Sequence, residues 1–348
     1  MAVLMVALLL GLFAILLWKV KLSPFHEDYL SPHATNSIKG IFAIIILFSH
    51  MRGYLTLPDS LGSKVFLLFL DCLGQAMVAM YLFYSGFGIL ESIRKKSSYM
   101  DYFFRNRICK TLIHFDLAVA IFVVSGIIIG KIYPVNFYVT CWIGWNSVGN
   151  SNWFIFDILA LYLGVLLISK LCRTDINKEN EKRFLCLLTL YTAGLWAILY
   201  SVKHESYWVD TLMTFPLGMW YSHFKDSIDK MVRKTKYYYP IFATLSIILS
   251  LWRFVIGVDM FGFFTCGFAL WMSLLTMKIK FDNIILQKIG TLAFSIYILQ
   301  RLPMNILEYY GINGNIPLFV CLSICCTFIL AHIFNKMLCR VDSKIVKQ

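Results

Sequence analysis

The sequence predicts an all-α integral membrane protein, a polytopic helical bundle. Of its 348 residues, 59% are hydrophobic and only 15% are charged, and the mean hydropathy is +0.71. A soluble domain has about 25% charged residues. The apolar residues also gather in runs of membrane-spanning length, since a hydrocarbon core about 30 Å thick requires about 20 helical residues. Backbone amides in lipid must be satisfied within their own segment, so each run is predicted to be a helix.

Eleven such runs follow one another, with short loops and no soluble domain between them. The first run lacks a basic segment before it and a small-residue cleavage site after it, which favours a retained anchor over a cleaved signal peptide. We therefore expect about ten core transmembrane helices plus one extra N-terminal helix. The runs lie near residues 2–18, 37–56, 65–90, 111–133, 153–171, 184–202, 207–223, 237–257, 260–277, 286–306 and 315–338.

The basic residues predict how the bundle lies in the membrane. Alternate loops carry most of the 32 Lys and Arg residues, and basic loops resist translocation, so these loops should face the cytoplasm. The chain is expected in the cell membrane (the inner or plasma membrane), with its N-terminus outside and its C-terminus in the cytoplasm. The net charge of +13 follows from this bias and suits anionic lipid headgroups, so no nucleic acid is expected as a partner. The basic residues left on the outside are Arg52, Lys64, Lys131, Lys203, Arg253 and Arg301.

The informative residues are polar side chains inside the helices, because ionisable groups in lipid are costly and usually serve a function. His50 is the clearest case, at the end of "SIKGIFAIIILFSH". Lys39 stands eleven residues earlier, which places both on one helix face, within about 20° and about 16 Å apart along the axis. A surface lysine plus a histidine bonded to a neighbouring helix would explain the pair equally well. The ten cysteines show no metal-ligand spacing and no disulfide framework, so no metal is expected.

The next predicted helix carries a second polar face. In "FLLFLDCLGQAMVAMYLFYSGFGIL", Asp71, Gln75 and Ser85 recur at helical spacing, with Asp71 at a depth comparable to that of His50. Hydrogen bonds between helices are the alternative interpretation for Gln75 and Ser85.

A basic loop follows this helix. In "ESIRKKSSYMDYFFRNRICKTL", Arg105 and Arg107 lie beside paired phenylalanines, and Lys110 comes next. The positive-inside bias accounts for part of this charge. Arginine also binds phosphate through its planar fork, and an aromatic neighbour can stack on a nucleobase. The loop is therefore a candidate nucleotide-phosphate site.

Trp153 and Asp157 lie in "SNWFIFDILALYLG", near the outer end of a later helix. Tryptophan rings in and beside the preceding outer loop could stack on sugar faces. An interfacial aromatic belt explains them nearly as well.

Taken in order, these segments resemble motifs of the bacterial membrane acyltransferase-3 family, whose members mostly O-acetylate sugars of surface polysaccharides. That family begins its core with a basic residue, ten residues and a histidine, as "KGIFAIIILFSH" does, although Lys39 stands where arginine is usual. A Ser-Gly segment, "YLFYSGFGIL", and an arginine motif, "FFRNRICK", follow. "NWFIFDILALYLG" and "IGTLAFSIYILQ" are similar to two later helices of the family.

The resemblance implies three parts: an extra N-terminal transmembrane helix and cytoplasmic linker (1–34), a membrane acyltransferase domain (35–338) and a basic cytoplasmic tail (339–348). It implies catalytic roles for His50 and Lys39, and Asp71 is a third catalytic candidate because of its depth beside His50. Two positions depart from the family: Gln300 replaces a common histidine, and Asp157 stands one residue before a common glutamate. The implied binding residues are Arg105, Arg107, Lys110 and Ser85 for the acyl donor, and Trp153, Asp157, Tyr297, Gln300 and Arg301 for the acceptor.

The expected reaction moves an acyl group, most often acetyl, from cytoplasmic acyl-CoA to a sugar hydroxyl of a surface polysaccharide or lipid-linked sugar. Acetyl-CoA is a co-substrate here. His50 would act as the general base, because histidine has a pKa near the operating pH. Two other classes remain open. A polysaccharide transporter would show related halves or broken helices, and a membrane glycosyltransferase or polymerase would carry acidic residues in a large outer loop.

Overall fold

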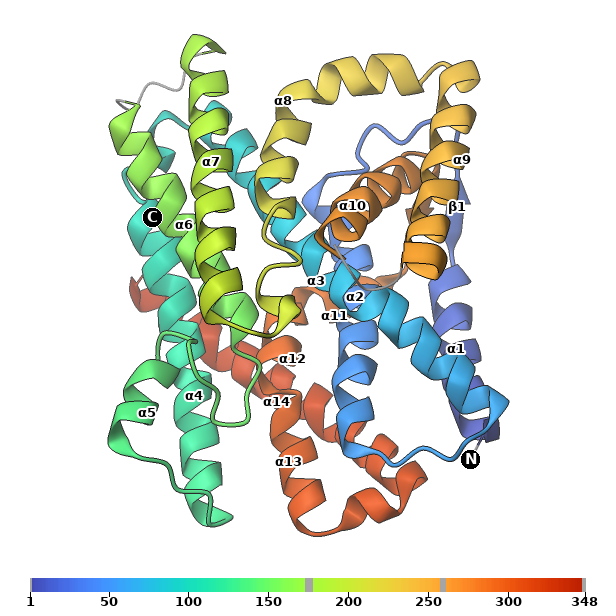
Figure 1. Cartoon of the computed structure of the whole chain (residues 1–348), viewed down its shortest axis with the longest axis vertical. Helices are drawn as coiled ribbons and strands as arrows, with labels where there is room; N and C mark the ends of the chain where they lie inside the picture. Colours follow the sequence, from blue (N-terminus) through green and yellow to red (C-terminus); the bar gives the residue numbers. More distant parts are fainter. Residues whose placement is uncertain (1, 173–177, 257–260, 346–348) are drawn as a thin grey trace.

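The computed structural model describes residues 2–172, 178–256 and 261–345, and these residues are mostly helical (Figure 1). Each of the eleven predicted runs contains α-helix, which confirms the all-α class. The α-helices are α1 (Ala2–Leu17), α2 (Pro32–Met51), α3 (Leu61–Lys95), α4 (Lys110–Ile128), α5 (Val135–Cys141), α6 (Trp153–Leu171), α7 (Lys178–Val202), α8 (Thr214–Val232), α9 (Thr235–Leu251), α10 (Phe261–Lys278), α11 (Ile284–Thr291), α12 (Ala293–Leu299), α13 (Arg301–Tyr309) and α14 (Ile316–Ile345). Shorter 3-10 or π-helical turns are η1 (Arg52–Tyr54), η2 (Ser97–Tyr99), η3 (Phe104–Cys109), η4 (Ser206–Trp208), η5 (Trp252–Ile256) and η6 (Ile312–Gly314).

Seven helices in the described part of the chain are long and apolar enough to cross a membrane. They contain α2, α3, α4, α6, α7, α10 and α14. The other predicted spans are helical but shorter or more polar. α1 is 16 residues long, and the second half of α8 carries Lys225, Asp226, Asp229 and Lys230.

The predicted single helix at 286–306 is instead three short helices, α11, α12 and α13. Pro303 explains the second interruption: proline has no N–H, and its ring clashes with the carbonyl four residues earlier, here that of Leu299. Gln300 lies at this break, between α12 and α13. At this break the buried side-chain amide of Gln300 donates to the backbone oxygen of Tyr297.

Two elements at the chain ends were not predicted. In the linker after α1, β1 (Val20–Leu22) pairs antiparallel with β2 (Ile279–Phe281), which fastens the linker to the end of α10. Beside this pair, a hydrogen bond from Lys280 holds the pKa of Asp28 below its ordinary value. At the other terminus α14 continues to Ile345, so the predicted tail is helical up to that residue, and residues 346–348 lie outside the described part.

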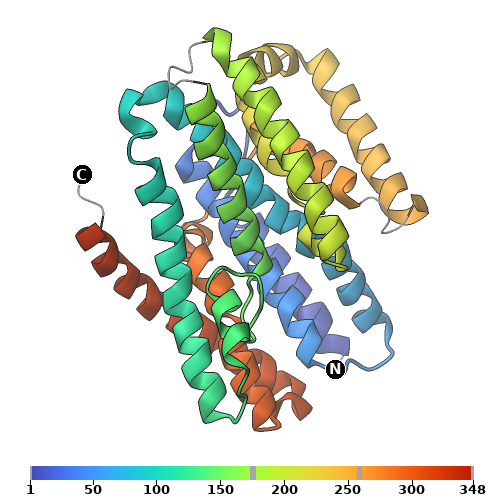
Figure 2. The same cartoon turned by 60° about the vertical axis from the view of Figure 1, so that its left-hand side comes forward.

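Two helix crossings bring backbones into direct contact. At the crossing of α3 and α8, a Cβ on Gly86 would lie 2.1 Å from the carbonyl oxygen of Phe215, and a Cβ on Gly218 would lie 2.1 Å from that of Phe83. Gly40 of α2 and Gly290 of α11 form a similar crossing. Small residues of this kind let helices approach closely in lipid. α3 also packs against α1, α2 and α10 in the middle of the bundle (Figures 1 and 2), so these crossings fix the two helices that carry the site.

We expect Gly218→Ala to lower the melting temperature, because its methyl group would overlap the carbonyl oxygen of Phe83. Overpacking of this kind costs about 1–3 kcal/mol. Thermal unfolding of the purified protein in detergent measures the effect. Gly194→Ala is the matched control, since no atom lies within 4 Å of that added Cβ, and an equal loss in both variants would contradict the close crossing.

Candidate active site

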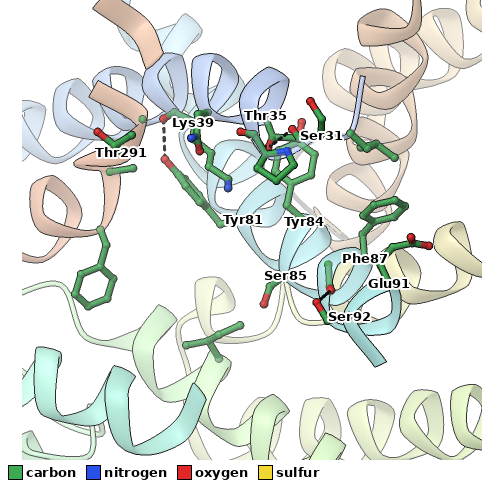
Figure 3. A pocket seen from close by; sticks show the side chains of 18 of the residues that line it. Ser31, Thr35, Lys39, Tyr81, Tyr84, Ser85, Phe87, Glu91, Ser92 and Thr291 are labelled. Atoms are coloured by element: carbon green, nitrogen blue, oxygen red, sulfur yellow. Dashed lines mark hydrogen bonds between the residues drawn. The ribbon is translucent and has the colours of Figure 1, made fainter. Parts of the chain in front are cut away.

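A cavity of about 1060 Å³ lies between α2, α3, α6 and the α11–α12 segment (Figure 3). Its lining runs from Ser31 to Ile46 on α2 and from Lys95 to Val78 on α3. At 1.5 Å per helical residue, the cavity extends over about 22–26 Å. The end of the cavity near Ser31 and Lys95 lies beside the loops 18–31 and 96–103. We call this side of the molecule the basic end. The cavity therefore leads from the basic end into the interior of the bundle.

α2 begins at this end for local reasons. Pro32 occupies the first helical turn, where its missing N–H costs nothing, and the Ser31 hydroxyl accepts a hydrogen bond from the backbone N–H of Ala34 at 3.2 Å. The helix then carries Lys39 into the cavity wall and His50 beyond it. One continuous helix thus joins both residues, as the spacing predicts.

Four basic side chains line the cavity, and they fall into two kinds. Lys95 and Lys225 are neutralised, because Lys95 pairs with Glu91 at 3.1 Å and Lys225 with Asp229 at 2.5 Å. Lys39 and Arg107 have no carboxylate partner among the residues that the structure describes. A cation held in a membrane interior without a counter-charge is costly, so this pair suits an anionic ligand.

Tyrosine rings surround the two unpaired cations. The Nζ atom of Lys39 lies 6.0 Å from the ring centroid of Tyr84, and Tyr81 donates to the backbone oxygen of Lys39 at 2.8 Å (Figure 3). Arg107 donates from Nε to the hydroxyl of Tyr99 at 2.9 Å, and the Tyr99 ring lies 5.9 Å from its guanidinium carbon. These contacts hold the cations in place without neutralising them.

The structure divides the predicted phosphate cluster. Arg107 lines the cavity, whereas Arg105 lies over the ring of Tyr102, 5.1 Å from its centroid, and is absent from the lining. Lys110 pairs with Asp342 of α14 at 2.6 Å, also away from the cavity. Ser85 does line the cavity, and its hydroxyl lies 2.9 Å from that of Tyr162.

His50 lies about one helical turn beyond Ile46, the last α2 residue of the lining. Its ring centroid is 6.2 Å from that of Tyr297, which also lines the cavity. Its Nδ1 atom lies 2.7 Å from Nε2 of the fully buried Gln300 and 3.4 Å from the hydroxyl of Ser151. His50 therefore stands beside the inner end of the cavity, held by residues of two other segments.

Two arginines lie near His50, and one of them has no partner. Arg52 pairs with Asp71. Arg301, directly after Gln300, lies close enough for its charge to act on His50, and it forms no ion pair or hydrogen bond within the described ranges. Asp71 is 46% exposed and does not line the cavity. Within the described residues its link to His50 runs through Arg52, and its catalytic role stays a prediction.

Asp157 and Trp153 occupy different surroundings. Asp157 is fully buried, and neither of its carboxylate oxygens has a hydrogen-bond partner in the described residues. It lies near Tyr297, whose hydroxyl is also buried and unpaired. Trp153 packs against Tyr207, with ring centroids 5.7 Å apart, and does not line the cavity. Their roles toward the acceptor stay predictions.

Residues 33–336 match a protein family described as an acyltransferase domain. The chain belongs to the acyltransferase-3 family. This membership makes the protein a membrane acyltransferase, as the resemblance predicts. Neither the curated proteins nor the solved structures that were compared with the chain give a match.

Sequence reasoning missed several residues of this acyltransferase site. Tyr81 had a usable signal, because it lies one helical turn before Ser85 on the same predicted face. Tyr84 lies one helical turn after Tyr81 and directly before Ser85. Ser151 had none, since it lies in an irregular loop without periodicity. Asn305 of α13 donates a hydrogen bond to the backbone oxygen of Gly149, and within the loop the N–H of Val148 donates to the side chain of Asn150. These contacts hold the loop beside His50.

Proposed function

We propose that this acyltransferase moves an acetyl group from acetyl-CoA, bound from the cytoplasm, to a hydroxyl of a polysaccharide or lipid-linked sugar at the outer side of the cell membrane. One observation carries the proposal: the cavity opens at the basic end, presents two cations that have no carboxylate partner in the described residues, and ends beside a histidine. The positive-inside rule supports the basic end as the cytoplasmic one. The N-terminus would then lie outside and the C-terminus inside.

The unpaired cations fit the donor. CoA carries anionic phosphates on a long arm that ends in the thioester, and the cavity offers Arg107 and Lys39 along its length. Arginine suits phosphate because its fork binds bidentately, and the lysine adds a point charge further in. The thioester would then lie near the inner end, next to Tyr297.

The chemistry there is a direct acyl transfer. His50 takes the proton of the acceptor hydroxyl, the oxygen forms a bond to the acyl carbon, and the carbon–sulfur bond breaks. The proton on His50 then passes to the departing thiolate, which leaves as CoA thiol. In this proposal Arg301, a cation near His50 without a partner in the described structure, offsets the negative charge that develops on the thioester oxygen.

The inner end of the cavity supports a short acyl group. The rings of Phe154 and Tyr297 lie 5.4 Å apart in an edge-on contact, and both line the cavity together with Ile46. Tyr297 also lies beside His50, with ring centroids 6.2 Å apart. A two-carbon acyl group fits such a constriction better than a fatty acyl chain.

We expect His50→Ala to lower acetyl transfer about 100-fold or more, because general-base catalysis contributes about 10²–10⁴-fold. Membranes that contain the variant are given labelled acetyl-CoA, and the acetyl group on membrane glycan is counted. His204→Ala, at an exposed loop position, is the control. Near-normal transfer by an inserted His50→Ala protein would exclude His50 as the base.

Arg107→Met is expected to raise the KM for acetyl-CoA about tenfold or more, because a charge-assisted hydrogen bond is worth about 1.5–3 kcal/mol. Lys110→Met is the matched control: it removes a nearby charge that pairs with Asp342 and does not face the cavity. The control is expected to keep its donor KM. Equal KM changes in the two variants would contradict the assignment of Arg107 to the donor.

Lys39→Arg is expected to retain most of the activity, and Lys39→Met is expected to lose it, because the proposed role of Lys39 depends on its charge. Initial rates at several acetyl-CoA concentrations separate donor binding from turnover. If Lys39→Met kept the wild-type kcat and KM, Lys39 would be an anchor at the membrane surface and not a donor contact.

A further inference from the structure

The contacts of Gln300 determine how its side-chain amide is oriented. Its Nε2 atom lies 3.2 Å from the backbone oxygen of Tyr297 and 2.7 Å from Nδ1 of His50. A carbonyl oxygen can only accept, so the amide must present its NH₂ group to Tyr297. The same NH₂ group then donates its second hydrogen to His50. The orientation of the amide therefore follows from the backbone oxygen of Tyr297, which can only accept.

The orientation has a consequence for His50. An Nδ1 atom that accepts a hydrogen bond carries no proton, so the neutral ring must be protonated on Nε2. A general base needs a free lone pair, and in this arrangement Nε2 has none and Nδ1 is occupied by Gln300. The structure therefore holds His50 in a resting form that cannot yet accept a proton.

The other end of the same amide offers a second arrangement. Gln300 is fully buried, and its Oε1 atom has no hydrogen-bond partner in the described part of the chain. If the amide turned over, and the ring gave its Nε2 proton to water and took one from water at Nδ1, Oε1 would accept from the protonated Nδ1. Nε2 would then be free to take the proton of the acceptor hydroxyl. The contact with Tyr297 would be lost, but a hydrogen bond to a charged ring is roughly twice as strong as a neutral one.

We propose that Gln300 is a positioning residue that sets which ring nitrogen of His50 carries the proton, and that its amide turns over when His50 acts as the base. The turning of the amide rests on the proposed function, whereas the position of the proton on resting His50 does not. Glutamine suits this role because its two ends are a donor and an acceptor of the same shape. Leucine or methionine would offer neither.

The other charged and titratable groups around His50 do not substitute for Gln300. Arg301 and Arg52 are cations, so they cannot accept from a protonated Nδ1. Tyr297 faces the ring at 6.2 Å between centroids, and Asp71 is occupied by Arg52. In the described structure, the groups within hydrogen-bond reach of Nδ1 are Gln300 and the Ser151 hydroxyl, the latter at 3.4 Å.

The test is nitrogen NMR of the full-length protein in nanodiscs, with ¹⁵N-labelled histidine and the His50 signals assigned by their loss in His50→Gln. The ring-nitrogen shifts distinguish a protonated from a bare nitrogen. In the neutral wild-type protein, we expect a protonated Nε2 and a bare Nδ1. A wild-type His50 with the proton on Nδ1 would overturn the proposal without any variant of Gln300.

Variants then test the turning of the amide. In Gln300→Glu, which can accept but not donate when ionised, the proton should move to Nδ1, and His50 should titrate at a higher pH than in the wild type. In Gln300→Met, which covers the case in which Gln300→Glu fails to fold, the preference for Nε2 should be lost. Gln287→Glu, the same change on α11 beside Asp282, should leave the His50 signals in place.

Acetyl transfer in membranes separates this inference from the proposed function. Both hold if Gln300→Met lowers kcat about tenfold or more, leaves the KM for acetyl-CoA in place, and is rescued by Gln300→His, which can also donate and accept. If His50→Ala is inactive but the His50 signals are the same in Gln300→Glu and Gln300→Met as in the wild type, the role of Gln300 is wrong and the base assignment stands. If the NMR shifts change as expected but His50→Ala is active, the base assignment is wrong.

Discussion

The arrangement of the site depends on two cations that lack a counter-charge. Lys39 and Arg107 face one cavity inside the bundle, and in the described structure neither has a carboxylate partner, whereas the neighbouring Lys95 and Lys225 do. Desolvating a cation is expensive, and a protein normally offsets that cost with an ion pair. Here an anionic ligand would offset the cost of desolvating the two cations. Such a ligand gives a function to the direction of the cavity, to its tyrosine rings and to the histidine at its inner end.

Local backbone features hold this arrangement in place. The close crossing at Gly40 and Gly290 ties α2 to α11, and that at Gly86 and Gly218 ties α3 to α8, so the two helices that line the cavity have fixed neighbours. Pro303 accounts for the break between α12 and α13, and Gln300 lies at this break with its side-chain amide against His50. The position of His50 therefore depends on two features: the continuous helix α2 that carries it, and the break between α12 and α13, where Gln300 contacts it.

The sequence predicts the fold and the central helix well, because periodicity and hydropathy act along a single helix. Lys39 and His50 lie on α2 as their spacing requires. The basic loop is different: η3 is a π-helical turn, so Arg105, Arg107 and Lys110 point to different surroundings, which no α-helical period anticipates. The pairing of β1 with β2 joins three-residue strands far apart in the chain, too short for a pattern. The break at Gln300 was readable from Pro303, but its partner His50 lies 250 positions away.

The central claim is that an anionic acyl donor enters from the basic end and that its acyl group leaves toward the other end. The most direct measurement uses proteoliposomes in which the orientation of the protein has been established by protease cleavage of the loops. Acetyl-CoA is supplied on one side only, and labelled acetyl is measured on a glycan acceptor enclosed on the other side. The account predicts product when acetyl-CoA meets the basic end and the glycan meets the opposite end. Product formed only when both substrates share the basic side would contradict it.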